Sequence, residues 1–290
     1  MPYACLPAGR RYAIFSLKED MESMSKWTIR PIVTGYANSD KKTYLYHHST
    51  HPYWNPEGKV LLPTMAFLAQ SGKENILVDT GMAWTERAST YHHPGSYQPE
   101  GAAIHERLAS LGIKCEDVGL VIFTHLHWDH VFYMEKFVNA RFIAHRTEYE
   151  FAMNPIPLYY KSYEYPILGL RRPFEGIKID LVDGEKEITS GIRVFPSPGH
   201  SPGHQSVEID TVEGSYICCG DSIFIYDNLT PIPEIHYSIT PPARYANVVE
   251  TWKSIEELKA RAKSKDFILP THAPELETRP ATKGVLATLK

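Results

Sequence analysis

Three histidines and one aspartate lie within one short segment, His125-Leu-His-Trp-Asp-His130. Neutral imidazole nitrogens and carboxylate oxygens are ligands that zinc and similar divalent metals prefer, and catalytic zinc sites leave a position open for water. The chain contains 14 histidines among 290 residues. At that frequency, chance places such a cluster in only about two chains in a thousand. The segment therefore predicts that His125, His127, Asp129 and His130 bind metal.

A short apolar run, 118–124, precedes this segment and predicts a buried strand that ends where the histidines begin. In an extended turn His125 and His127 are two residues apart, so their side chains face the same side. Asp129 and His130 begin a predicted helical turn. These four side chains can therefore converge on one pocket.

Three more candidate ligands stand where other apolar runs end. His200 lies in a turn rich in proline and glycine, Asp221 follows a glycine that closes an apolar run, and His272 lies just beyond another. Such turns can present a side chain at the end of a strand. A lone histidine or aspartate at a strand end is more often an ordinary loop residue, so the prediction depends on all three together.

The order of these seven residues, with the upstream motif Ile76-Leu-Val-Asp-Thr-Gly81, resembles the metallo-β-lactamase superfamily between positions 76 and 272. The resemblance implies an α/β fold, an αβ/βα four-layer sandwich with two divalent metals at one edge. Zinc is the first expectation, with manganese, iron or cobalt as alternatives. The implied sets are His125, His127 and His200 for one metal, Asp129, His130 and His272 for the other, Asp221 as the bridge, and Asp79 as an outer residue that orients the ligand loop.

Within the superfamily, Thr124-His-Leu-His-Trp-Asp-His130 and Pro198-Gly-His-Ser-Pro-Gly-His204 are similar to the lactonase-like branch, which includes N-acyl homoserine lactonases. This resemblance implies a hydrolase in which a metal-bridging hydroxide opens a ring carbonyl, most simply that of a lactone. Asp129 is the expected proton shuttle. A cyclic imide or amide hydrolase and a thioester hydrolase of the glyoxalase II kind stay open as alternatives; for the latter, Lys161, Arg171 and Arg172 are the candidate basic residues.

The chain departs from the lactonases at two places near the predicted site. Lactonases have small residues after the metal-binding segment, where this chain has Val-Phe-Tyr at 131–133, and a tyrosine three residues after the bridging aspartate, where this chain has Phe224. A phenyl ring cannot donate a hydrogen bond to a substrate carbonyl. We expect another tyrosine to substitute; the candidates are Tyr226, Tyr237 and those from 159 to 165, including Tyr159, Tyr160 and Tyr163.

Two loop-like segments rich in aromatic residues, 82–99 and 154–174, are expected to shape the substrate pocket, or else to form a lid or a dimer contact. The remaining paired or neighbouring histidines lack a carboxylate or cysteine at a workable spacing. We expect them to be solvated rather than to bind metal; they are His47, His48, His51, His92 and His93.

Periodicity predicts a β-rich first half followed by alternating elements. The expected strands are 28–36, 60–70, 74–79, 140–145, 177–182, 192–196, 204–210 and 215–219, with Ser71-Gly-Lys73 as a hairpin turn. The expected helices are 101–112, 147–153 and about 242–262. In the last helix, Tyr245 and Val249 are among the expected core residues, and Pro241 and Pro242 suit its first turn.

The composition is that expected of a single enzyme domain that spans residues 1–290. The hydrophobic share of 43% is enough for a full core. The net charge of −4 disfavours nucleic acid as a partner and, together with the site, favours a small-molecule substrate. Residues 1–26 are a candidate arm for a homodimer. Since the sequence lacks a signal-peptide pattern and an apolar run of about 18 residues, we expect no membrane association and a cytoplasmic location.

The four cysteines are too few and too irregularly spaced for a disulfide framework. Cys218 and Cys219 are adjacent in a predicted strand, so their side chains point to opposite faces and cannot easily reach one metal. We expect both to be reduced core residues. A β-lactamase, a nuclease, a di-iron flavoprotein and a non-catalytic scaffold fit the sequence less well than a lactone hydrolase.

Overall fold

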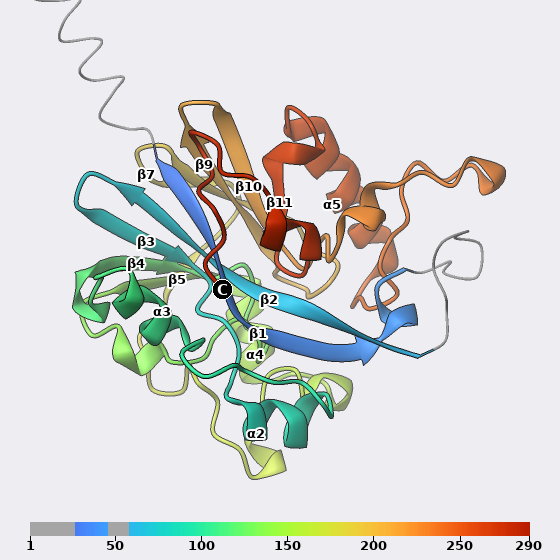
Figure 1. Cartoon of the computed structure of the whole chain (residues 1–290). Helices are drawn as coiled ribbons and strands as arrows, with labels where there is room; N and C mark the ends of the chain where they lie inside the picture. Colours follow the sequence, from blue (N-terminus) through green and yellow to red (C-terminus); the bar gives the residue numbers. More distant parts are fainter. Residues whose placement is uncertain (1–26, 46–57) are drawn as a thin grey trace, which may run out of the picture.

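The computed structural model of the chain describes residues 27–45 and 58–290. Within these ranges the strands form two sheets that pack face to face, with helices on the outer sides (Figure 1). The proposed N-terminal arm and the histidines at 47, 48 and 51 lie outside the described residues. No helix in the described ranges has the length and apolar character needed to cross a membrane.

The first sheet has six strands in the order β1-β2-β3-β4-β5-β6, antiparallel from β1 to β3 and parallel from β3 to β6. The strands are β1 (Thr28–Asp40), β2 (Lys59–Ser71), β3 (Glu74–Val78), β4 (Val118–Ile122), β5 (Arg141–His145) and β6 (Asp180–Val182). β1 extends beyond its predicted end because its last residues pair with the start of β2. The predicted hairpin is confirmed, since Ser71 pairs with Glu74.

The second sheet has the order β11-β10-β9-β8-β7, antiparallel except for the parallel pair β10 and β11. Its strands are β7 (Lys186–Thr189), β8 (Ile192–Pro196), β9 (Gln205–Thr211), β10 (Gly214–Gly220) and β11 (Ile268–Pro270). β7 was not predicted from the sequence. This short edge strand reads Lys-Glu-Ile-Thr and has little apolar content, so it is defined by its pairing with β8 rather than by its composition.

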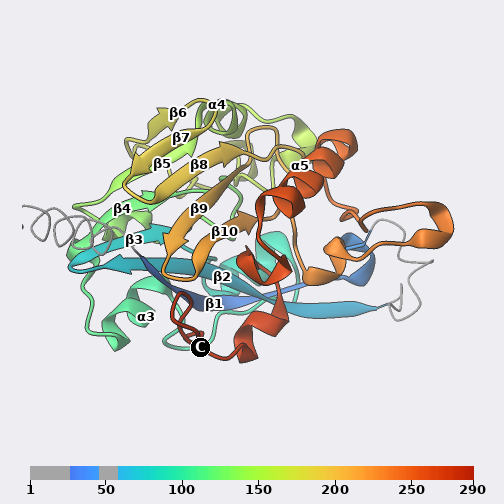
Figure 2. The same ribbon diagram turned by 90° about the horizontal axis from the view of Figure 1, so that it is seen from above.

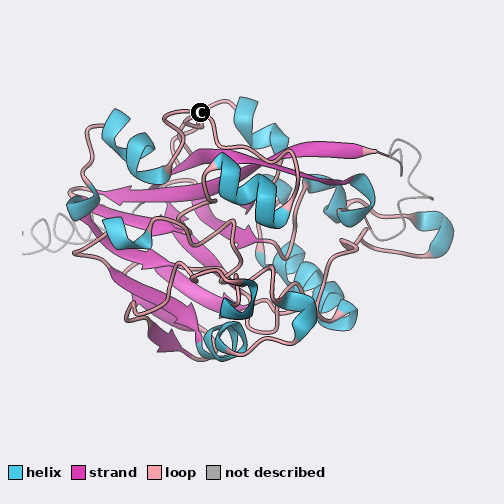
Figure 3. Ribbon diagram, turned by 90° about the horizontal axis from the view of Figure 1, so that it is seen from below, coloured by secondary structure: helices cyan, strands magenta, loops and turns pink. Residues whose placement is uncertain are grey.

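The core lies in three layers, one between the sheets and one on each outer face. β-branched and aromatic residues of both sheets fill the middle layer. Helices α3 (Ile104–Ser110) and α4 (Arg146–Met153) cover the outer face of the first sheet, and α5 (Val248–Arg261) covers that of the second (Figures 2 and 3). This arrangement confirms the αβ/βα four-layer sandwich.

Adjacent residues of β10 illustrate how the layers divide the chain. Cys218 lies in the core between the sheets, whereas Cys219 packs beneath α5. Both are fully buried free cysteines. The prediction that they are reduced core residues on opposite faces is confirmed.

Helix α5 begins later than predicted. Asn247 caps it by accepting hydrogen bonds from the amides of Val249 and Glu250 (3.0 and 3.2 Å). Before this cap, backbone amides bond to other loops instead of to a helix, and Ala246 N donates to Gly199 O at 2.7 Å. The placement of Pro241 and Pro242 in the first turn and of Tyr245 and Val249 in the helix core was therefore wrong; Val249 is 56% exposed.

Candidate metal centre

The seven predicted ligands follow the carboxyl ends of four strands and meet at one edge of the sandwich. His125, His127, Asp129 and His130 follow β4, His200 follows β8, Asp221 follows β10 and His272 follows β11. Their ligand atoms form two groups, each with all atoms within 4.8 Å of one another. The first group is His125, His127 and His200, and the second is Asp129, His130, Asp221 and His272.

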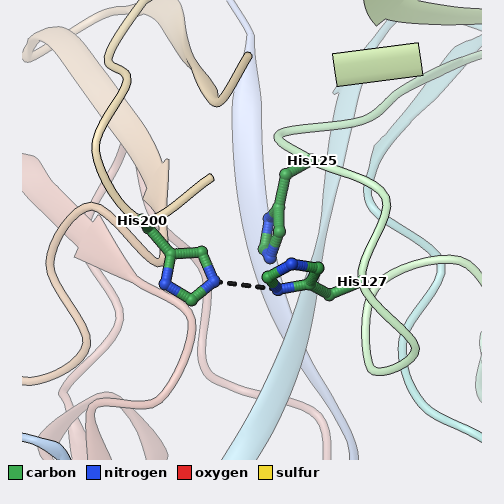
Figure 4. Close-up of side chains that lie close together, drawn as sticks. All are labelled: His125, His127 and His200. Atoms are coloured by element: carbon green, nitrogen blue, oxygen red, sulfur yellow. Dashed lines mark hydrogen bonds between the residues drawn. The ribbon is translucent and has the colours of Figure 1, made fainter. Parts of the chain in front are cut away.

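Three imidazole rings of the first group turn toward one another (Figure 4). His127 Nδ1 and His200 Nε2 are 2.9 Å apart, and the rings of His125 and His127 meet edge to face with centroids 4.5 Å apart. All three side chains are buried. Three imidazole nitrogens thus share one small volume, as in the three-histidine sites of catalytic zinc.

The Asp221 carboxylate contacts both groups. Its Oδ1 lies 3.3 Å from Nε2 of His130 and 3.3 Å from Nε2 of His272. Its Oδ2 lies 3.4 Å from Nε2 of His200 and 3.9 Å from Nε2 of His125. One carboxylate therefore has an oxygen facing each group, which is the arrangement that a ligand shared by two ions requires.

Asp129 contacts only the second group. Its Oδ2 lies 3.6 Å from Nε2 of His272, and its Oδ1 lies 3.9 Å from Nε2 of His130. At 8% exposure it is the most accessible of the seven residues. Its carboxylate therefore lies at the boundary between the ligands and the pocket beside them.

The residues present fit divalent metal. His125 Nε2, His130 Nε2 and Asp221 Oδ1 are buried and have no hydrogen-bond partner among the described residues. An unsatisfied buried polar atom costs about 1–3 kcal/mol. Coordination of an ion removes that cost, and imidazole with carboxylate is a donor set that divalent metals accept.

The pKa shifts differ between the two ligand groups. Burial, followed by the neighbouring histidines, lowers the pKa of His125 and His127 well below the ordinary value, so both imidazoles are neutral at neutral pH. Burial acts to raise the pKa of Asp221, but the adjacent histidines hold it well below its usual range. In the first group, lone pairs are therefore available for a cation. Burial acts to lower the pKa of His130 and His272, but Asp221 and the neighbouring carboxylates raise it, so these two histidines must lose a proton to bind metal.

Asp79, which follows β3, bonds to the loop that carries four of the predicted ligands. Its Oδ1 accepts from Thr124 N, and its Oδ2 from Thr124 Oγ1 and His130 Nδ1, each at 2.8 Å. His272 Nδ1 similarly bonds to Pro63 O at 2.8 Å. These bonds leave Nε2 of both histidines facing the site. Asp79 has a φ of 60°, an unfavourable backbone conformation for an aspartate, and such strain concentrates at functional sites.

Residues 60–272 match the family model of the metallo-β-lactamase superfamily. The chain belongs to this superfamily. It is 31% identical to the N-acyl homoserine lactonase AiiA of Bacillus thuringiensis subsp. kurstaki over 194 residues, which cover 63% of this chain and 73% of the relative. It is 29% identical to the N-acyl homoserine lactonase AttM of Azorhizobium caulinodans over 218 residues, which cover 69% and 78%.

Solved structures share the superfamily fold. A crystal structure of a quorum-quenching N-acyl homoserine lactone lactonase matches with a TM-score of 0.68 and 25% identity, covering 89% of this chain and 97% of the other. A metal-dependent hydrolase described as probable, from Staphylococcus aureus, also gives a TM-score of 0.68, at 19% identity, with 86% and 90% covered. These matches extend the likeness to most of the chain, and membership together with the two ligand groups supports the use of divalent metal.

Glu148, which was not predicted from the sequence, joins three loops around the predicted ligands. Its fully buried carboxylate accepts hydrogen bonds from Leu126 N (3.0 Å), Tyr163 Oη (2.8 Å), Ser201 Oγ (2.6 Å) and Gly203 N (3.2 Å). Burial raises its pKa although these bonds favour the charged form. A glutamate in the first turn of a helix is usually exposed, so the sequence carried no signal for this role.

A narrow pocket opens beside the ligands, and one predicted pocket residue, Phe224, lines it. The Phe224 ring stacks on His272 with centroids 5.5 Å apart and meets His200 edge-on at 5.1 Å. Tyr159 lines a larger cavity of about 540 Å³ next to this pocket. Tyr159 and Phe224 therefore line two adjoining cavities, and the cavity of Phe224 also contains predicted ligands.

The structure does not bring the other predicted tyrosines to the narrow pocket. The Tyr163 hydroxyl donates to Glu148, and the Tyr160 ring stacks on Tyr165 with centroids 4.6 Å apart. The Tyr226 hydroxyl donates to Ile268 O at 2.8 Å, and the residue lines a different pocket. The Tyr237 ring meets Trp252 edge-on.

Tyr44, which sequence reasoning missed, is the only tyrosine among the described residues that line the narrow pocket. It follows the short turn Lys41–Thr43 at the end of β1, and its ring meets Phe224 edge-on with centroids 5.4 Å apart. It is 3% exposed, and burial raises the pKa of its hydroxyl, so the group remains a proton-bearing donor at neutral pH. Tyr44 lies far upstream of the predicted metal-binding motifs, so the sequence did not indicate that it belongs to the site.

The two aromatic loops at 82–99 and 154–174 are joined by a buried ionic cluster. Glu164 accepts from Arg87 Nε (2.9 Å) and Nη2 (2.7 Å) and pairs with His92 Nε2 at 2.8 Å. The His92 ring stacks on Trp128 with centroids 4.1 Å apart. The expectation that His92 is solvated was therefore wrong, because its ring is buried between Trp128 and Glu164. His93 lines the narrow pocket and is also mostly enclosed.

Proposed function

We propose that this chain is a hydrolase that uses two divalent ions to open lactone rings. The contact of the single Asp221 carboxylate with both ligand groups carries the proposal. The substrate class is supported by relatives in the same superfamily that are named N-acyl homoserine lactonases and are 31% identical to this chain. A narrow pocket lined by five of the seven predicted ligands opens beside them.

In this proposal each ion would be held by its own histidines, and Asp221 would serve both. Zinc is the metal proposed first, and manganese, iron or cobalt suit the same ligands. When bound, such ions polarise a carbonyl oxygen and lower the pKa of coordinated water toward about 7. The ligand sets are His125, His127 and His200 for one ion, and Asp129, His130 and His272 for the other.

Asp129 is the proposed proton carrier. Hydrolysis adds water to the carbonyl carbon and breaks the bond between that carbon and the ring oxygen, which then needs a proton. Asp129 is the ligand carboxylate most open to the pocket. It is placed to take a proton from the attacking water and return it to the ring oxygen as general acid.

Tyr44 is the proposed hydrogen-bond donor to the reacting carbonyl. Phe224 cannot donate, whereas Tyr44, whose ring contacts Phe224 in the same pocket, carries a hydroxyl group. A fixed donor directed at an oxygen that gains negative charge stabilises the transition state. In this proposal the hydrogen-bond donor at this wall comes from the residues that follow β1, and not from the loop after β10.

Two of the three basic residues considered for a thioester hydrolase form contacts elsewhere. Arg172 donates to the carbonyls of Ala152 (3.3 Å) and Met153 (3.0 Å) at the end of α4, and Lys161 donates to His92 O at 3.1 Å. These contacts favour lactones over a glutathione thioester. Cyclic imides and amides, which present the same type of ring carbonyl, are the second candidate class.

Elemental analysis followed by a substrate panel tests the proposal. The panel contains lactones of several acyl lengths, a cyclic imide, a glutathione thioester, a β-lactam and a phosphodiester. We expect about two divalent ions per chain and turnover of lactones without turnover of the phosphodiester. Metal-loaded protein that hydrolyses the thioester or the imide but no lactone would overturn the substrate assignment.

A further inference from the structure

Arg244 lies between the narrow pocket at the metal ligands and the larger cavity of about 540 Å³ beside it. Thr43 is the other residue shared by the two linings. A substrate that reaches the ligands from the larger cavity therefore passes the guanidinium group. The charge of Arg244 also extends into the site, where, after burial, it is one of the charges that lower the pKa of His127.

The groups bound to Arg244 are neutral. Its Nη2 donates to Ser162 Oγ at 3.0 Å, and its Nη1 lies 3.3 Å from His93 Nε2. Arginine only donates, so His93 Nε2 accepts and its Nδ1 carries the proton toward Ser39 Oγ, 3.2 Å away. Burial, followed by Arg244, lowers the pKa of His93 to about 4, so this ring is uncharged at neutral pH.

No carboxylate among the residues that the structure describes forms an ion pair with Arg244. A guanidinium offers five N–H donors in a planar fork that matches a carboxylate in a bidentate manner. Neutral partners occupy part of this donor set and leave the positive charge uncompensated. The side chain therefore retains the capacity to bind an anion.

Contacts from several segments hold Arg244 in place. Ala243 N donates to Thr43 O at 3.0 Å, and Ala246 N donates to Gly199 O at 2.7 Å. The side chain itself contacts His93 from the 82–99 loop and Ser162 from the 154–174 loop. Because the group is fixed before a ligand arrives, less conformational entropy is lost on binding.

The larger cavity complements a negatively charged ligand with an apolar portion. Lys42 adds a second cation to its wall, and Leu158 and Tyr159 add apolar surface. No aspartate or glutamate occurs among the described residues that line it. The described wall of the larger cavity is therefore positively charged, whereas the narrow pocket carries the two carboxylates Asp129 and Asp221.

We infer that Arg244 is a specificity-determining residue that binds a carboxylate group on the substrate, so that the preferred substrate is an anionic lactone rather than one with an uncharged side chain. The inference rests on the proposed lactone hydrolysis for the identity of the reacting group. The carboxylate lies at the junction of the two pockets, and the remainder of the substrate occupies the larger cavity.

A matched pair of substrates tests the inference. One is a lactone whose side chain ends in a carboxylate, and the other is the same lactone with the carboxylate converted to a primary amide. A hydrogen-bonded charge pair is typically strong enough for wild-type kcat/KM to favour the acid at least about 10-fold. In Arg244→Gln this ratio should fall to about one, and Arg244→Lys should retain part of it.

Arg141→Gln is the matched control, because Arg141 is an exposed arginine paired with Asp180 outside both pockets. It should keep the wild-type ratio. Binding of the two ring-opened products, measured by calorimetry on the metal-loaded protein, gives a second readout that does not require turnover. In this measurement the product with the carboxylate should bind the wild-type protein at least about 10-fold more tightly than the product with the amide. Arg244→Gln should remove this difference in affinity.

The outcomes separate this inference from the proposed function. Equal turnover of acid and amide by wild type would overturn the anion site and leave lactone hydrolysis standing. Turnover of neither lactone would overturn the proposed function, and the calorimetric comparison would still decide whether Arg244 binds a carboxylate. A ratio unchanged in Arg244→Gln would likewise reject the assignment.

Discussion

Phe224 and Tyr44 share one wall of the pocket, and only Tyr44 carries a hydroxyl group. Removing a single hydrogen-bond donor to a developing oxyanion costs about 100-fold or more in kcat. We expect Tyr44→Phe to lower kcat by about 100-fold with metal content unchanged, as measured by steady-state kinetics and elemental analysis. Tyr36→Phe is the control, since that hydroxyl bonds to Glu277 outside the pocket; equal losses in both variants would contradict the role of Tyr44.

Asp129 combines metal binding with proton transfer in our proposal, and substitution separates the two. Asp129→Asn keeps an oxygen ligand but cannot carry a proton, and general acid–base groups contribute about 100-fold or more to rate. We expect most of the metal to be retained and turnover to fall by at least that factor. Asp183→Asn, at an exposed pair with Arg146, should change neither property. Full activity in Asp129→Asn would reject the proton-carrier role.

Helix α4 contributes to the site through Glu148, which joins the loops that hold His125 to His130 and His200. In Glu148→Gln the amide nitrogen cannot accept the bonds that one carboxylate oxygen now receives from Ser201 and Gly203. Loss of such outer contacts typically lowers metal affinity about 10- to 100-fold. Competition with a chelator measures this change, and the exposed Glu150→Gln on the same helix is the control. Unaltered affinity in Glu148→Gln would show that α4 does not position the ligands.

The whole molecule should lose stability in mild acid because buried neutral histidines resist protonation. His93 is an instance: burial, then Arg244, lowers its folded-state pKa to about 4, while the unfolded value is about 6.5. As the pH falls from about 6.5 toward about 4, the unfolded state gains a proton that the folded state does not, so the free energy of unfolding decreases. His93→Gln, measured by urea unfolding at matched metal content, should lose less stability than wild type over this range. Equal losses would contradict this contribution.

The sequence by itself determined the fold class and predicted the metal ligands, because both depend on local patterns. Each predicted ligand follows an apolar run that is typical of a buried strand, and residue types such as histidine beside aspartate indicate the chemistry directly. Strand alternation likewise predicted that Cys218 and Cys219 face different layers. These features were predictable because they need only short stretches of chain.

Only the tertiary structure decided which residues surround the ligands. Tyr44, Glu148 and Arg244 lie in separate segments, and nothing in their local sequence indicates a common site. Long-range contacts also set the start of α5, since the amides before Asn247 bond to distant loops instead of extending the helix. Burial of Glu148 and the positive charge at the junction of two pockets arise from packing between elements. Substrate choice, unlike the hydrolytic chemistry, is therefore a property of the folded arrangement.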